Sequence, residues 1–284
     1  MKRFGLFVAI CVFPVAALAI GMVISPVQLG LSGPPGSTVS GVINVSSSRP
    51  RENTIRVSFG DYVIDAEGKR TEVTSVNVPT RSCRAWLDVD QQQFVSPEQG
   101  KVPVVISARI PADASGSYWA EAYFESLPAP PSFTPGGRAP VVGLQIVPRI
   151  GIPIIVTAKG TEKYNVKIDG LGAARTADGV EASVQIENSG NAVVMISGAV
   201  ALEKPAAGAE VPEELISKDI EPVTSYPGVK RNIKIALPLK PVDPASIDLH
   251  AYLRFGRSPD QALEASSKLR TLLENQKNGE MGRQ

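Results

Sequence analysis

Apolar residues alternate with polar or small residues along most of this chain, in short runs that end at clusters of Pro, Gly, Asn and Asp. A period of two is typical of a β-strand with one buried face. In the first part of the chain the runs predict an antiparallel β-sandwich of about seven strands. They cover residues 23–32, 37–48, 53–65, 83–90, 101–111, 117–126 and 141–156.

A second series of alternating runs starts after Gly160. It covers residues 162–171, 179–190, 191–203, 229–239 and 246–256, with a weaker run at 215–223. This pattern predicts a second sandwich of roughly 100 residues. We therefore expect an all-β protein with two tandem immunoglobulin-like β-sandwiches, one over residues 20–157 and one over residues 158–257.

The pattern changes again at Ser258, where a serine, a proline and an acidic residue precede a helix-like segment. Such residues favour the first turn of a helix. The stripe formed by Leu263, Leu269, Leu272 and Leu273 is only partial. We predict a short amphipathic helix within a helical or disordered tail over residues 258–284.

The first residues indicate a targeting segment. Lys2 and Arg3 precede an apolar stretch, and Ala17-Leu18-Ala19 has the small-x-small form of a cleavage site. We expect residues 1–19 to be a cleaved signal peptide, with no membrane span left in the mature chain. The alternative is an uncleaved N-terminal membrane anchor, because the apolar stretch continues through Ile24.

Charge and cysteine content narrow the class further. Cleavage after Ala19 would remove Lys2 and Arg3 and change the net charge from +1 to −1. Such a chain has no basic surplus for binding nucleic acid. Cys83 would be the only cysteine left, so no internal disulfide can form, and we predict a small buried residue there.

Candidate catalytic chemistry is sparse. The only histidine is His250, and alternation predicts that it lies exposed on the polar face of its strand with Asp248, Tyr252 and Arg254. No second histidine or nearby cysteine completes a metal site. The chain lacks GxSxG, a phosphate-binding Gly-rich loop and GxGxxG. We therefore expect neither an enzyme nor a cofactor nor a small-molecule substrate.

Tyr118 stands where immunoglobulin-like domains place a tyrosine corner, just before the sixth strand. In that motif the tyrosine hydroxyl ties the entry loop to the strand. Alternation puts Trp119 and Tyr123 on one face and Tyr118 on the other. Ala120 occupies the usual cysteine position, so the corner would belong to a disulfide-free sandwich.

The order of these features resembles the periplasmic pilus-chaperone family over residues 23–157. VISPVQLGLSGPPGSTVSGVINVSS is similar to the first two strands of that family. FVSPEQGKVPVVISARIPADASGSYWAEAYFES resembles its proline-glycine turn, fifth strand and sixth strand. GLQIVPRIGIPIIVTAKG resembles its seventh strand, which continues into the second domain.

The resemblance implies a periplasmic, non-enzymatic protein of two immunoglobulin-like domains at an angle. It implies partners that are exported pilin-like subunits or surface proteins, held by a lent edge strand. The family anchors a subunit carboxylate with basic residues in the first and seventh strands. Here Gln28 is the candidate anchor in the first strand, and Arg149 is the only basic candidate in the seventh.

The run VVGLQIVPRIGIPIIV, residues 141–156, carries the binding hypothesis. Its even positions are all apolar, and its prolines indicate an edge strand or a bulge because proline cannot donate to a ladder. Such a strand can fill its own core or be offered to a partner by β-augmentation. Our candidate partner-binding residues are Leu144, Ile146, Arg149, Ile150 and Ile152.

A structural or adhesive cell-surface module built of spacer sandwiches is the alternative function. The Pro-rich stretch at 126–140 would then make the contacts, because Pro-rich segments are extended and solvated. The two hypotheses differ in whether the protein accepts a strand from another chain.

Overall fold

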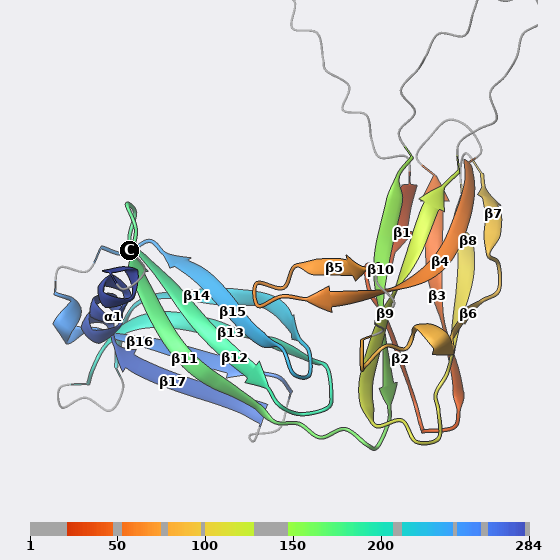
Figure 1. Cartoon of the computed structure of the whole chain (residues 1–284). Helices are drawn as coiled ribbons and strands as arrows, with labels where there is room; N and C mark the ends of the chain where they lie inside the picture. Colours follow the sequence, from red (N-terminus) through yellow and green to blue (C-terminus); the bar gives the residue numbers. More distant parts are fainter. Residues whose placement is uncertain are drawn as a thin grey trace, which may run out of the picture.

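The computed structural model describes residues 22–47, 53–74, 79–97, 100–127, 147–206, 212–240, 243–256 and 261–281. It contains two β-sandwiches set at an angle, with the long hairpin of the first reaching toward the second (Figure 1). Residues 1–19, the predicted signal peptide, lie outside the described part. Within that part no helix combines the length and the apolar content needed to cross a membrane.

The N-terminal sandwich pairs a four-stranded sheet with a larger one. The first has the order β1 (Met22–Ser25), β3 (Thr38–Ser47), β8 (Val102–Arg109) and β6 (Leu87–Val89). The second has the order β2 (Leu29–Gly33), β10 (Arg149–Ala158), β9 (Gly116–Ser126), β4 (Asn53–Ile64) and β5 (Arg70–Val73), with β7 (Gln93–Ser96) also on β4. A short 3-10 helix, η1 (Arg84–Trp86), precedes β6.

This connectivity is that of an immunoglobulin-like domain. Its first, second, fifth and fourth strands form one sheet, and its third, sixth and seventh form the other. The first strand is split here, because β1 lies in one sheet and β2 crosses to the other to pair with β10 in parallel. The predicted immunoglobulin-like sandwich is therefore confirmed.

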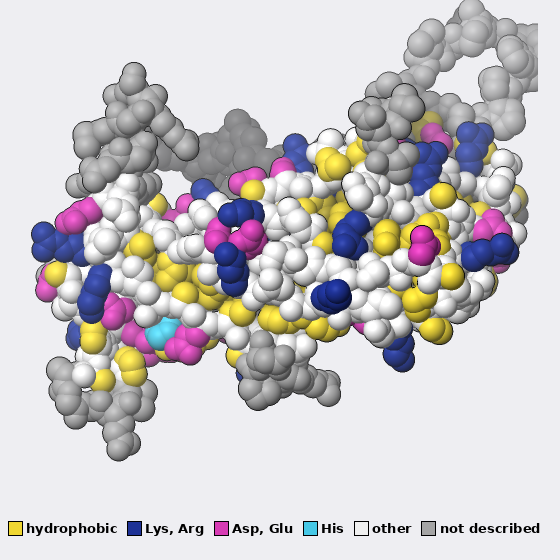
Figure 2. All heavy atoms as spheres, turned by 60° about the horizontal axis from the view of Figure 1, so that its bottom comes forward, with side chains coloured by type: hydrophobic (Ala, Val, Ile, Leu, Met, Phe, Trp, Pro, Cys, Tyr) yellow, Lys and Arg dark blue, Asp and Glu magenta, His cyan; other side chains and the backbone are white. Residues whose placement is uncertain are grey.

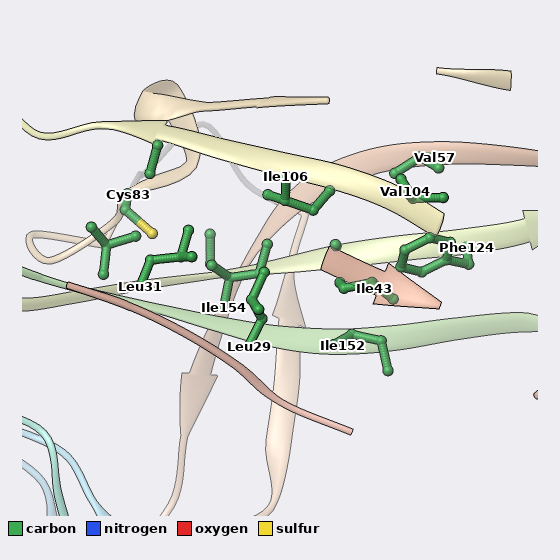
Figure 3. Close-up of a cluster of buried hydrophobic side chains, with 14 of the residues drawn as sticks. Leu29, Leu31, Ile43, Val57, Cys83, Val104, Ile106, Phe124, Ile152 and Ile154 are labelled. Carbon is green, nitrogen blue, oxygen red and sulfur yellow. The ribbon is translucent and has the colours of Figure 1, made fainter. Parts of the chain in front are cut away.

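The core of this sandwich follows the alternation seen in the sequence. Ile152 and Ile154 of β10 point inward toward Leu29, Ile43 and Phe124 (Figure 3). Cys83 is fully buried among them, as predicted, and burial raises the pKa of its thiol. The tyrosine corner is also present, because the backbone N–H of Ser115 donates to the Tyr118 hydroxyl at 3.4 Å.

The C-terminal sandwich has a three-stranded and a four-stranded sheet. The first has the order β11 (Val166–Arg175), β12 (Val180–Asn188) and β15 (Lys230–Leu237). The second has the order β14 (Glu213–Ser225), β13 (Val194–Lys204), β16 (Asp248–Arg254) and β17 (Ala262–Lys268). A short 3-10 helix, η2 (Pro244–Ser246), precedes β16. The weak run at 215–223 is thus part of one of the longest strands.

The C-terminal segment differs from the sequence prediction. Residues 262–268, expected within a helical or disordered tail, form β17 and pair with β16 along their whole length. The helix α1 (Leu269–Met281) follows directly, and its Leu269, Leu272 and Leu273 are buried in the core of the sandwich. The strand was missed because ALEASSK alternates too weakly to be recognised without its neighbour β16.

A small aromatic cluster joins the two sandwiches. Tyr62, Trp119 and Ile155 on the outer face of the N-terminal sandwich enclose Tyr226 of the C-terminal one. The ring centroids of Trp119 and Tyr226 are 5.0 Å apart, and the Tyr62 and Tyr226 hydroxyls are 3.1 Å apart. The predicted shared face of Trp119 and Tyr123 is therefore the face turned outward from the first core.

Candidate functional site

One side of the N-terminal sandwich carries two open strand edges. Among the described strands β1 pairs only with β3, and β2 covers only Ile154–Ala158 of β10. The first half of β10, from Arg149 to Pro153, has β9 on one side and no described strand on the other. Only three residues connect β1 to β2, so both edges lie on the same side (Figure 1).

Two hydrogen bonds show which backbone groups β10 presents at its open edge. The N–H of Ser126 in β9 donates to the Pro148 carbonyl, whereas the N–H of Lys159 donates to the Gly33 carbonyl of β2. Because backbone direction alternates along a strand, even residues face β9 and odd residues face outward. Arg149 and Gly151 therefore present both N–H and C=O, and Pro153 presents only C=O.

Strand β1 also turns free backbone groups outward at its open edge. The N–H of Ile110 donates to the Ser37 carbonyl at 2.8 Å, so odd residues of β3 face β8 and even residues face β1. The register of β1 on β3 then turns the backbone of Met22 and Ile24 outward. Their side chains are buried, while Val23 between them is 55% exposed.

The open edges, like the short edge strand β7, carry fewer charged residues than the edge strands of the C-terminal sandwich. Strand β14 carries Glu213, Glu214, Lys218, Asp219 and Glu221 along its edge, and β17 carries Glu264 and Lys268. Charged side chains are a common device against unwanted strand pairing. Strands β1 and β2 have no charged residue, and the open half of β10 has only Arg149.

Only some of the predicted partner-binding residues of the seventh strand lie within the described part of the chain. Ile152 is buried in the core of its own sandwich, and Ile150 is partly buried against that core. The groups that this segment turns to the open edge are backbone groups. Leu144 and Ile146 lie outside the described residues.

Arg149 is neutralised by an acidic residue of β5. Its guanidinium donates to both carboxylate oxygens of Glu72, at 2.7 and 2.9 Å, and lies 3.6 Å from the centre of the Tyr123 ring. The hydrogen bond from Arg149 holds the pKa of Glu72 below its ordinary value. Arg149 therefore helps to fix β5 and is not a free charge at the edge.

Gln28 lies in a cleft between the two sandwiches, just where the open edge of β10 ends. The cleft measures about 420 Å³, and Pro153 and Tyr226 also line it. Two arginines complete the lining: Arg70, which is paired with Glu121 at 2.5 Å, and Arg231. The cleft thus has two basic side chains in its lining, and one of them, Arg70, is paired with a glutamate.

Arg231 has unusual surroundings for an arginine. It is only 9% exposed, its Nη1 reaches the Asp65 carbonyl at 3.5 Å, and its Nε has no hydrogen-bond partner. Among the described residues no carboxylate lies within 4.0 Å of it. Burial lowers the pKa of its guanidinium, so an anion in the cleft would be stabilised there.

Sequence reasoning did not identify Arg70 or Arg231 as site residues. Arg70 gives no signal, because its position follows from the β4–β5 hairpin crossing toward the C-terminal sandwich. Arg231 does give one, since it occupies the inward-facing register shared by Ile233, Ile235 and Leu237. A charge in an apolar register is a sign of a special environment.

His250 lies on the outer face of its strand, but the prediction that it is exposed is wrong. Its side chain is only 16% exposed, with Nδ1 3.2 Å from Glu203 and Nε2 2.8 Å from Glu264. Its ring stacks on Tyr252 with centroids 4.0 Å apart. Acidic side chains lie next to the histidine on the surface (Figure 2). Because Glu203 belongs to β13 and Glu264 to β17, His250 connects its own strand β16 to both neighbours.

No protein-family model and no curated protein matches this chain. Solved structures similar to it include the class 5 fimbriae chaperone CfaA, with 15% identity over 87% of this chain and 99% of that chain and a TM-score of 0.46. A CsuC–CsuE chaperone–tip subunit complex of Acinetobacter baumannii gives 8% identity over 86% and 97%, with a TM-score of 0.42. The E. coli chaperone DraB gives 10% identity over 86% and 98%, with a TM-score of 0.39.

Proposed function

We propose that this chain is a periplasmic chaperone-like protein that holds exported pilin-like subunits by adding their extended strands to its open edge. The observation that carries the proposal is the pair of open edges at β1 and the first half of β10, whose one charged residue, Arg149, is paired with Glu72. Exposed, uncharged edges pair readily with other chains. A domain that leaves such edges open, beside a second domain whose edge strands β14 and β17 are charged, is suited to strand capture.

The edge defines the chemistry of the partner. Arg149 and Gly151 offer two donors and two acceptors in a row, which suits the backbone of an extended segment. Beside them Ile150 and Ile152 form the rim of the apolar core. A partner strand with apolar residues at alternate positions would extend that core, as the incomplete sandwich of an exported subunit requires. No catalytic step is involved.

The cleft suggests how the end of the partner is held. A strand on the open half of β10 runs toward Gln28, where Arg231 lies buried without a carboxylate partner. A carboxylate from the partner would offset the cost of burying that guanidinium. We therefore assign the anchoring role to Arg231, with Gln28 and Arg70 as neighbouring donors.

The edge is tested by comparing Arg149→Pro with Arg149→Ala. Both variants lose the Glu72 ion pair, but only proline removes the outward N–H, and the β9 ladder does not use that N–H. The probe is a labelled peptide of about nine residues with Val at alternate positions, followed by fluorescence anisotropy. Loss of one hydrogen bond should weaken binding roughly fivefold for Arg149→Pro relative to Arg149→Ala. Equal affinity of the two variants would refute edge pairing.

The anchor is tested with the same peptide in free-acid and amidated forms. Arg231→Gln should weaken binding of the free-acid form roughly tenfold, because a charge-assisted hydrogen bond is lost, and should leave the amidated form unchanged. Lys234→Gln is the matched control, since Lys234 lies exposed on the same strand. An equal effect on both peptides would show that Arg231 acts only on the fold.

A further inference from the structure

We infer that Pro153 ends the pairing register at the open edge and so keeps a bound strand from displacing β2. The inference rests on the proposed function, and it concerns where pairing stops. Pro153 is the last residue of β10 before the segment covered by β2, because Ile154 already pairs with Leu29. It is buried, and it marks the junction between the open and the covered edge.

Proline matters at position 153 because the backbone nitrogen of this residue points to the open edge. Odd residues of β10 face outward, so the nitrogen of residue 153 points to the same edge as the N–H groups of Arg149 and Gly151. Proline has no hydrogen there and cannot donate to a ladder. The row of outward donors is therefore interrupted between Gly151 and Ile155.

Strand β2 needs such protection because it resembles the kind of strand that the edge would bind. It is short, extended and apolar, and it holds β10 only from Ile154 to Ala158. A partner strand on the open half would lie end to end with β2 along the same edge. Each bond that β2 lost could be replaced by a bond to the partner, so displacement would cost little unless the ladder is broken between them.

The missing N–H of Pro153 interrupts the hydrogen-bond ladder along the edge of β10 at the point where the cleft begins. Pro153 lines the cleft with Gln28 and Arg231, so a strand that stops pairing at Gly151 has its end directed into that cleft. Pro153 thus determines register and length for the bound segment. A purely structural role would be different, because the proline would then only spare an unpaired N–H where the chain leaves β2 toward Pro26.

Amide hydrogen exchange on the whole protein, with and without the alternating Val peptide, separates these roles. In the wild type the peptide should slow exchange at Arg149 and Gly151 about tenfold or more and leave Leu31 and Gly33 of β2, whose backbone groups face β10, unchanged. In Pro153→Val, the peptide should speed exchange at Leu31 and Gly33 at least about tenfold, because a displaced β2 loses its acceptors on β10. Pro153→Ala serves if the valine variant does not fold, and Pro103→Val in β8 is the control for adding an N–H away from the site.

Three results would overturn the inference. Faster exchange at Leu31 and Gly33 in the peptide-bound wild type would show that Pro153 is no stop. Unchanged exchange at these positions in the bound Pro153 variants would limit the proline to a structural role. Absence of any slowing at Arg149 and Gly151 in the wild type would reject edge binding itself, and the stop with it.

Discussion

At the scale of single residues, the junction between the sandwiches depends on a few backbone contacts. Gly116 has a positive φ of 76°, and a side chain there would collide with the carbonyl of Asn191 in the other sandwich. The N–H of Ser117 donates to that same carbonyl at 2.8 Å, and Arg81 donates to it at 3.3 Å. The close approach therefore requires glycine both for conformation and for space.

Gly116→Ala should lower the free energy of unfolding by about 1–3 kcal/mol, since it combines backbone strain with a steric clash. Gly30→Ala is the matched control, because Gly30 has no left-handed backbone and nothing within 4 Å of an added Cβ. Chemical denaturation of both variants measures the difference. Equal stability of the two would show that Asn191 moves aside without cost.

The ion pair between Arg149 and Glu72 should give a small pH dependence. Because Arg149 lowers the pKa of Glu72 in the folded state, this contribution is present above the unfolded pKa and is lost as pH falls through the folded value. Both side chains are more than a third exposed, so we expect no more than about 0.5 kcal/mol after solvent screening. Denaturation at pH 7 and pH 3 should show that Arg149→Ala destabilises the protein only at the higher pH.

At the scale of elements, the edge strands of the two sandwiches differ in how they are covered and charged. The edge strand β11 of the C-terminal sandwich is packed against α1, and the charged edges of β14 and β17 are exposed. On the N-terminal sandwich, β1 and the first half of β10 have no row of charges, and no helix within the described residues covers them. The helix is therefore part of a domain that closes its edges, and the open edge is a property of the other domain.

A chain that ends after Lys268 should show how much α1 contributes. It would lose the burial of Leu269, Leu272 and Leu273, worth roughly 1.5–3 kcal/mol each as an upper estimate. We expect the C-terminal sandwich to unfold at a clearly lower denaturant concentration while peptide binding to the N-terminal edge persists. Unchanged stability would mean that the leucines pack without closing the core.

At the scale of the whole molecule, the two sandwiches meet through a compact aromatic contact supplemented by the β4–β5 hairpin. The N–H of Asn232 donates to the Ala66 carbonyl in the turn of that hairpin at 2.7 Å. Tyr226 fills the space between Tyr62 and Trp119. This contact forms one wall of the basic cleft, so the geometry of the cleft depends on the angle between the domains.

Tyr226→Ala should uncouple the sandwiches, because it removes the ring that Trp119 and Tyr62 enclose. We expect one cooperative thermal transition to separate into two, with a loss of about 3–5 kcal/mol in the less stable unit. Calorimetry measures this, and Tyr164→Ala, a change at an exposed tyrosine, is the control. A single, unshifted transition would contradict a coupling role for Tyr226.

Much of the fold could be predicted from local pattern. Alternation identified most strands of both sandwiches, put Ile150 and Ile152 on one face of their strand and separated Trp119 from Tyr118, because side-chain direction has a fixed period of two. It left open which of these faces is turned to the core. The corner at Tyr118 followed from spacing in the same way. Strand β17 could not be recognised, since its weak alternation becomes a strand only against β16.

Only part of the candidate site could be predicted from the sequence. The segment around Arg149 was identified, but whether its side chains or its backbone face a partner depends on pairing with β9 and β2, which no local pattern contains. Likewise, the burial of Arg231 beside Gln28 arises from two domains and a hairpin brought together over long sequence distances.

The sequence by itself determined an all-β chain of two sandwiches, the apolar face of the seventh strand, and the prolines that interrupt its donors. These properties depend on residue type and on a period of two, which short segments carry. The tertiary structure alone decided which edges stay open, that Arg149 is neutralised by Glu72, and that Arg231 is buried with no carboxylate of the described residues within 4.0 Å. Those properties depend on long-range pairing and burial, and these exist only once the sheets have assembled.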